Sequence, residues 1–187
     1  MPTLGIDPGP RHNAWAHLDG RRLLDRGTVS GPDIATSKHP KAGVAWKRAL
    51  ANILEQLSLK LEEKQPSCVG IETVQHAISD TTRTDAQRQS QAINTQRTGE
   101  IIAGVQVLCA KRGLPCYLVH PVSSLAALGL RQGVTDRQVS ERAGLLFGVK
   151  GWAVGDAHQA RAAGVGLRAE SDWRRDKAAK KQGVLAV

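Results

Sequence analysis

LGIDPGPRHNAWAHLDG, residues 4–20, decides the fold of this chain. Its first residues belong to an apolar strand, residues 3–7, which ends at Asp7, and Pro8-Gly9 then favours a turn. Residues 13–18 alternate between polar and apolar side chains, Asp19-Gly20 is typical of a hairpin turn, and residues 22–29 follow as a third strand. The sequence therefore predicts that the chain begins with three antiparallel strands.

The next part of the chain predicts a helix and a buried strand. Over about residues 42–64, apolar side chains recur at steps of three and four, namely Trp46, Leu50, Ile53, Leu57 and Leu61. Residues 67–72 are an apolar strand that ends in an acid. Residues 76–97 are polar and weakly patterned, which indicates a mobile loop leading into a helix.

The last part adds helices around one further strand. A helix is expected over about residues 98–112, and residues 116–120 form an apolar strand. Thr135 and Gln138 fit a capping box at the start of another helix, and a final Ala-rich helix begins near Asp156. This order predicts an α/β fold, with a mixed five-stranded sheet (three antiparallel strands, then two parallel ones) flanked by helices.

The charge of the chain indicates a polyanionic partner. The sequence carries 26 basic against 17 acidic residues, a net charge of +9, which fits a nucleic-acid ligand as well as a need for solubility. Aromatic residues make up only 3%, which favours contact with a duplex backbone over stacking on single strands. The expected phosphate contacts are Arg83, Arg88 and Arg97 in the polar loop, and Arg137.

The cysteines and the N-terminal residues indicate the cellular compartment. Cys68, Cys109 and Cys116 are odd in number and lack metal-binding spacing, which indicates reduced, buried thiols. The first residues lack the features of a signal peptide, and no apolar run approaches the roughly 20 residues that a membrane span needs. We therefore expect a cytoplasmic protein.

Three acids stand at the ends of predicted elements. Asp7 ends the first strand, Glu72 ends the fourth, and Asp156 opens the last helix. If the two strands are parallel neighbours, Asp7 and Glu72 meet at one sheet edge, where close carboxylates repel each other unless a cation lies between them. Mg²⁺, with Mn²⁺ as a substitute, suits such oxygen ligands, and two ions can together hydrolyse a phosphodiester. Alternatively, the three acids are a turn residue, an exposed strand end and a helix cap.

Several of these segments resemble a known family. LGIDPGPRHNAWAHLDG and VGIETV (residues 69–74) are similar to the first two motifs of the RuvC-type Holliday-junction resolvases, and the resemblance extends over about residues 3–165. It implies an RNase H-like nuclease domain, residues 1–167, followed by a basic tail, residues 168–187. It also implies a homodimer that resolves branched DNA by two-metal hydrolysis, with Asp7, Glu72 and Asp156 as metal ligands.

The sequence departs from this family in two places. The last family motif holds two ligands three residues apart, whereas Asp156 has Gln159 at i+3, so that Gln159 or His158 is the candidate for a fourth ligand. An aromatic residue that often follows the family's Glu is replaced by Gln75 and His76. The alternatives are therefore a degenerate domain that binds branched DNA without cutting it, or a nuclease for other branched DNA or for RNA.

The homodimer is expected to form through the helix over residues 98–112. On this helix, Ile101, Val105 and Leu108 can face the sheet. Ile102 and Cys109 lie towards another side and would form an apolar strip suited to a two-fold contact. The alternative is that both sides are buried within one subunit.

Overall fold

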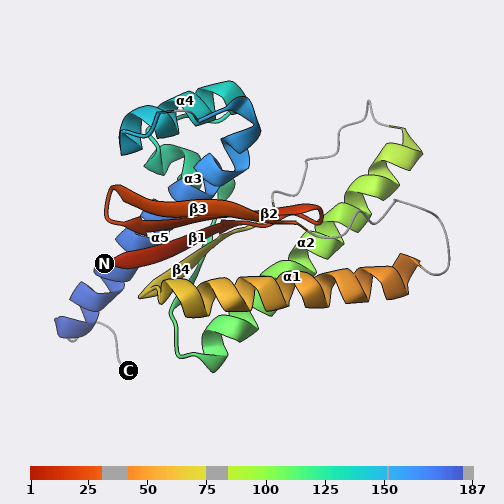
Figure 1. The fold of residues 1–187 in the computed structure, drawn as a ribbon, viewed down its shortest axis with the longest axis horizontal. Helices are drawn as coiled ribbons and strands as arrows, with labels where there is room; N and C mark the ends of the chain where they lie inside the picture. The colour runs from red at the N-terminus through yellow and green to blue at the C-terminus, as the bar shows by residue number, and fades with distance from the viewer. Residues whose placement is uncertain (31–41, 75–83, 151, 183–187) are drawn as a thin grey trace.

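A mixed five-stranded sheet lies at the centre of the molecule, with its strands in the order β3-β2-β1-β4-β5 (Figure 1). The structure is a computed structural model that describes residues 1–30, 42–74, 84–150 and 152–182. The antiparallel part consists of β1 (Pro2–Asp7), β2 (His12–Asp19) and β3 (Arg22–Ser30). The parallel part adds β4 (Cys68–Glu72) beside β1 and β5 (Cys116–Val119) beside β4. The predicted mixed sheet is therefore confirmed.

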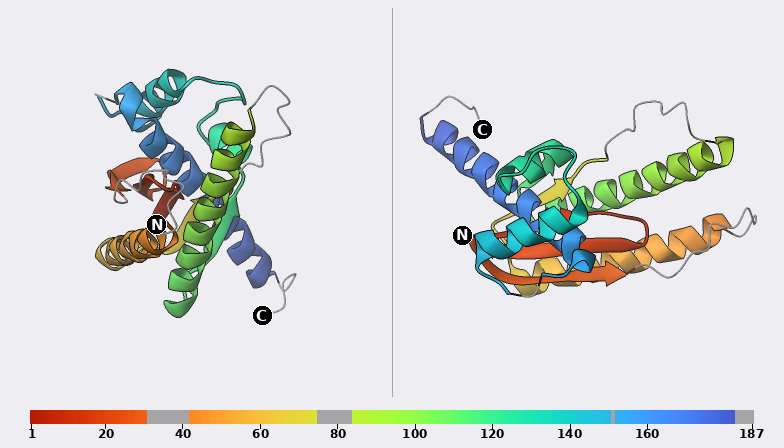
Figure 2. Two further views of the ribbon diagram at one scale, coloured as in Figure 1. Left: turned by 90° about the vertical axis from the view of Figure 1, so that its right-hand side faces the viewer. Right: turned by 90° about the horizontal axis from the view of Figure 1, so that it is seen from above.

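Helices cover both faces of this sheet. One face is packed by α1 (Ala42–Lys64) and α2 (Asp85–Lys111). The other face is packed by α5 (Ala157–Lys181), which a short 3₁₀ turn, η1 (Val154–Asp156), precedes. Two smaller helices, α3 (Pro121–Ala127) and α4 (Asp136–Phe147), pack against α5. Both α1 and α2 extend past the end of the sheet in the same direction (Figures 1 and 2).

The expected loop over residues 76–97 was wrong for its second part, because α2 already begins at Asp85. Thr84 caps this helix: its hydroxyl accepts from the Gln87 backbone N–H, and the Gln87 side chain accepts from the Thr84 N–H. This capping box, followed by good helix formers, creates a helix without any apolar pattern. Residues 75–83 lie outside the described residues.

The two faces of the sheet differ in side-chain size. Leu4, Ile6, Val69 and Ile71 alternate along β1 and β4 and are buried against α1 and α2. The residues between them point to the other face, since successive side chains of a strand alternate. There, Gly5 of β1 is the cross-strand partner of Gly70 of β4.

α5 packs backbone to backbone on this glycine pair. A Cβ added at Gly5 would overlap the carbonyl oxygen of Ala162 and lie 2.5 Å from the amide nitrogen of Gly166. A Cβ at Gly70 would lie 2.7 Å from the Cβ of Ala169. The position of α5 on the sheet therefore depends on the absence of side chains at both strand positions.

The apolar residues of α2 that were expected to form two separate sides pack into one core cluster. Cys109 is fully buried together with Ile101 and Val105, and Ile102 and Leu108 pack against the same cluster. The predicted separation between a core side and a dimer side of this helix was therefore wrong. The cause is that α1 covers a broad arc of α2, with Leu54 of α1 lying against Gly104.

α5 extends into the expected basic tail. It continues without a break through residue 167, where we expected the domain to end, and reaches Lys181, with Ala169 fully buried. The first fourteen residues of the expected basic tail are thus helical. Across the described ranges, no helix is both long and apolar enough to cross a membrane. The three cysteines are free thiols, and Cys68 and Cys109 are buried as expected.

Replacing Gly5 by Ala should destabilise the protein strongly, because the new methyl group collides with the α5 backbone, which cannot move without lifting the whole helix. Overpacking of this kind costs about 1–3 kcal/mol or more, measured as a lower urea midpoint. Gly99→Ala is the control, since a Cβ there meets no atom within 4 Å. It should be neutral or stabilise by up to about 1 kcal/mol. A Gly5→Ala variant as stable as the parent would contradict the close packing.

Candidate metal centre

Two carboxylates stand side by side where β1 and β4 end. Ile6 pairs with Ile71 in the parallel register, so Asp7 and Glu72 are the next residues on neighbouring strands. Each comes two residues after a glycine of the pair beneath α5, so both side chains point to the α5 face. Both are buried, with 8% of each residue exposed. The structure therefore brings these two predicted site residues together.

This arrangement perturbs the protonation of Glu72. Burial raises the pKa of Glu72 to about 7, and the negative charge of Asp7 beside it adds to this rise. Ser124 of α3 acts in the opposite direction, since its Oγ lies 2.5 Å from Glu72 Oε1 and donates a hydrogen bond. Near neutral pH a large fraction of Glu72 is therefore protonated, which reduces its repulsion with Asp7.

His158 joins the pair from the first turn of α5. Its Nδ1 lies 2.8 Å from Asp7 Oδ2, and 62% of its side chain is exposed. The hydrogen bond with Asp7 raises the pKa of His158. His158 precedes Ala162 by four residues and so lies on the α5 face that packs against Gly5. His158 was one of the two candidates for a fourth ligand, and the structure places it in contact with Asp7.

Asp156 is not brought into this group. Its Oδ2 lies 3.1 Å from the Arg26 guanidinium of β3 and accepts from the Ala153 backbone N–H. Arg26 in turn lies over the Trp152 ring, 3.9 Å from its centroid. The Asp156 side chain forms no capping hydrogen bond to α5, so the simple helix-cap interpretation does not describe it either.

Gln159 also points elsewhere. Its Nε2 donates to Thr28 Oγ1 of β3 at 3.3 Å. Within the described ranges, no three acidic, histidine or cysteine side chains converge closely enough to form a complete protein cage for a metal. Mg²⁺ does not need one, because one or two carboxylates commonly hold it together with waters and substrate phosphates. Asp7 and Glu72 therefore fit one hard cation, which would remove the repulsion within the pair.

Three of the expected phosphate contacts, Arg88, Arg97 and Arg137, lie on helices. Arg88 is exposed on α2, 3.9 Å from Asp85. Arg97 lies over the Trp46 ring at 5.0 Å, and Arg137 of α4 pairs with Glu141 at 2.7 Å. Arg83, like Gln75 and His76, falls outside the described residues.

Sequence reasoning missed Ser124 and Arg26. Ser124 is fully buried and contacts Glu72, 52 residues away along the chain, while Arg26 sits in a strand whose neighbours show no functional pattern. Nothing in the spacing of either residue signals its partner. Only the packing of α5 against the sheet, and of α3 against α5, brings these contacts about.

Comparisons by sequence identify no relative: no protein-family model and no curated protein matches the chain. Comparison of structures identifies proteins with a similar fold. The structure of RuvC from Thermus thermophilus matches with a TM-score of 0.66 at 19% identity, over 94% of this chain and 97% of that one. T. thermophilus RuvC in complex with a Holliday junction substrate gives the same score and identity, over 94% and 96%.

A weaker match is the Fowlpox virus resolvase, whose structure with Holliday junction DNA gives a TM-score of 0.48 at 13% identity, over 91% of this chain and 98% of that one. At such identities a structural likeness concerns the fold and not the activity. The chain therefore has the RNase H-like fold of RuvC, as the sequence predicted.

Proposed function

We propose that this protein is a metal-dependent, structure-specific DNA endonuclease that resolves Holliday junctions by paired nicks. The observation that carries the proposal is the buried Asp7–Glu72 pair at adjacent strand ends, where the pKa of Glu72 is raised to about 7. Such perturbed groups concentrate at functional sites. The junction as substrate is supported by the fold shared with T. thermophilus RuvC, which was solved with a junction bound.

Asp7 and Glu72 would hold Mg²⁺, or Mn²⁺ in its place. Bound there, the metal would activate water and stabilise the leaving oxygen of the phosphodiester. Ser124 fixes one Glu72 oxygen through its hydrogen bond and so orients the carboxylate. His158 does the same for Asp7 and holds a proton at Nδ1. These neighbours keep the two ligands in place before the substrate arrives.

Asp156 remains our candidate for a further ligand, needed if a second ion binds. It lies two residues before His158, and to reach the pair its carboxylate must leave Arg26. A DNA phosphate is a suitable new partner for that guanidinium. In this proposal the substrate itself frees Asp156. Gln159 is less suited to the role, since it bonds to Thr28.

Asp7→Asn and Glu72→Gln should each lower junction cleavage by at least about 100-fold, because even residues that only support metal ligands cost 10- to 100-fold when changed. The assay is nicking of a labelled four-way junction, with flap, duplex and RNA substrates in parallel. Glu55→Gln is the control, since Glu55 is exposed on α1, and its cleavage should equal that of the parent.

Two outcomes would contradict this proposal. Unchanged cleavage by Asp7→Asn would show that the carboxylate pair takes no part in the reaction. A parent protein that binds junctions but never nicks them with Mg²⁺ or Mn²⁺ would be a binding domain. Preferred cleavage of RNA would instead show that the substrate is RNA and not branched DNA.

Metal binding should weaken as the pH falls below about 7. Glu72 keeps its proton up to its raised pKa of about 7, and it must lose that proton before it can bind a cation. Mn²⁺ titrations should therefore give an affinity roughly tenfold lower at pH 6 than at pH 8. His158→Gln should keep this dependence, because Glu72 is intact. Equal affinities at pH 6 and pH 8 would show that Glu72 takes no part in binding.

The symmetry of a four-way junction calls for a two-fold dimer with two sites. Val107 is an apolar residue on the outside of α2, 54% exposed, and we propose that it lies in the dimer contact. Val107→Glu should then convert the dimer to a monomer in light scattering at micromolar concentration. Leu145→Glu is the control, since Leu145 is 77% exposed on α4, and it should leave the dimer intact. A parent monomer that nicks both junction strands in one encounter would refute the dimer.

A further inference from the structure

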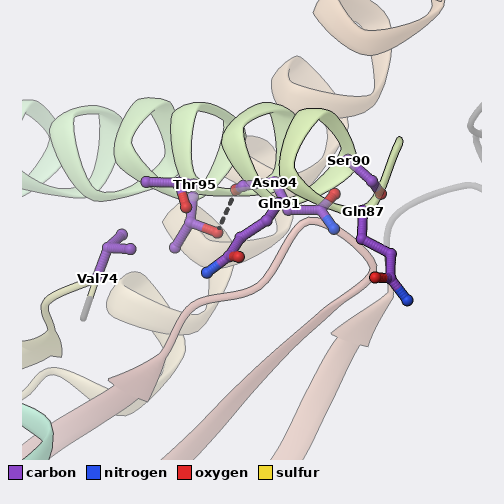
Figure 3. Close-up of a pocket in the computed structure, with 7 residues that line it drawn as sticks. Val74, Gln87, Ser90, Gln91, Asn94 and Thr95 are labelled. Atoms are coloured by element: carbon purple, nitrogen blue, oxygen red, sulfur yellow. Dashed lines mark hydrogen bonds between the residues drawn. The ribbon is translucent and has the colours of Figure 1, made fainter. Parts of the chain in front are cut away.

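A polar groove lies along the first half of α2, beside the end of β4 (Figure 3). It has a volume of about 540 Å³. Val74 borders it from the strand side, and α2 supplies Gln87, Ser90, Gln91, Asn94, Thr95 and Thr98. Resting on the proposed function, we propose that this groove contacts the nucleobases of the DNA strand next to the cleaved bond and sets a sequence preference.

The chemistry of the groove suits base edges. Gln87, Gln91, Asn94 and Thr98 follow one another at steps of four, three and four, so they form one stripe along the helix. Each amide offers two N–H donors and a carbonyl acceptor, and Asn or Gln pairs with both edge atoms of adenine. A phosphate groove would instead be lined with Lys or Arg, yet the lining residues within the described part of the chain are all uncharged, in a chain of net charge +9.

The groove starts next to the candidate metal centre. Val74 comes two residues after Glu72, and the stripe leads away from it along α2. From Gln87 to Thr98 a helix rises about 16 Å, at 1.5 Å per residue. At about 3.4 Å per nucleotide, that length matches roughly five nucleotides of one strand. A strand held at the carboxylates can therefore continue along the stripe.

This half of α2 has no role in the core. The buried residues of α2 are Ile101, Val105 and Cys109, all in its second half, and among residues 85–98 none is buried. The polar half is nevertheless held in place. The Thr84 capping box fixes its start, and Trp46 donates a hydrogen bond to Glu100 at its far end. A helix that is held at both ends and buries no side chain over this half is well suited to ligand contact.

The test selects junctions from a pool randomised over the nucleotides beside the nick, by binding in EDTA, and sequences the bound fraction. The parent should enrich one sequence by about tenfold or more, the discrimination that one bidentate base contact supplies. Gln91→Ala/Asn94→Ala should lose that enrichment. Gln89→Ala is the control on the opposite side of the same helical turns and should keep it.

A second variant separates base contact from a fold defect. Asn94→Asp exchanges an amide for an acceptor that suits cytosine, so the enriched sequence should change rather than disappear. Helix content by circular dichroism should be equal in all variants.

The results distinguish this inference from the proposed nuclease activity. A parent that enriches no sequence, or a double variant that enriches the same sequence equally, would overturn the role of the groove even if nicking proceeds. Sequence enrichment without any nicking would support the groove and overturn the nuclease.

Discussion

The contact between the α5 backbone and the Gly5–Gly70 pair determines where Asp7, Glu72 and His158 lie. Because neither strand presents a side chain there, the helix lies directly on the sheet. From that contact, two further residues along each strand lead to Asp7 and Glu72, and one helical turn back along α5 leads to His158. The placement of Asp7 beside Glu72, and the contact of His158 with Asp7, are therefore geometric results of the glycine contact.

The two faces of the sheet have different roles. The face with Leu4, Ile6, Val69 and Ile71 buries large apolar side chains against α1 and α2 and carries much of the hydrophobic stabilisation. The other face uses glycine and alanine, which contribute little apolar area but permit close approach. Charged groups can thus be placed on the second face at the strand ends, next to a core that does not depend on them.

Elements with a local signal could be predicted from the sequence, and contacts between distant elements could not. The strands and α1 follow from apolar periodicity, and the pairing of Asp7 with Glu72 follows from parallel neighbours. The first half of α2 has no apolar pattern and depends on the Thr84 capping box. The ion pair of Asp156 with Arg26 arises only from packing. His158 was undecided because a shift of one residue at the start of α5 rotates its side chain by about 100°.

The buried glutamate makes the metal-free molecule less stable than its fold permits. The pKa of Glu72 rises from 4.5 to about 7 on folding, so the folded state binds the extra proton between those pH values, and stability falls as the pH rises through that window. The loss at neutral pH is on the order of a few kcal/mol, a substantial part of the total for a small domain. Selection for stability alone would favour a neutral residue at this position. In the proposed function, the retained acid lowers stability and in return provides a cation ligand, a trade-off that is typical of active sites.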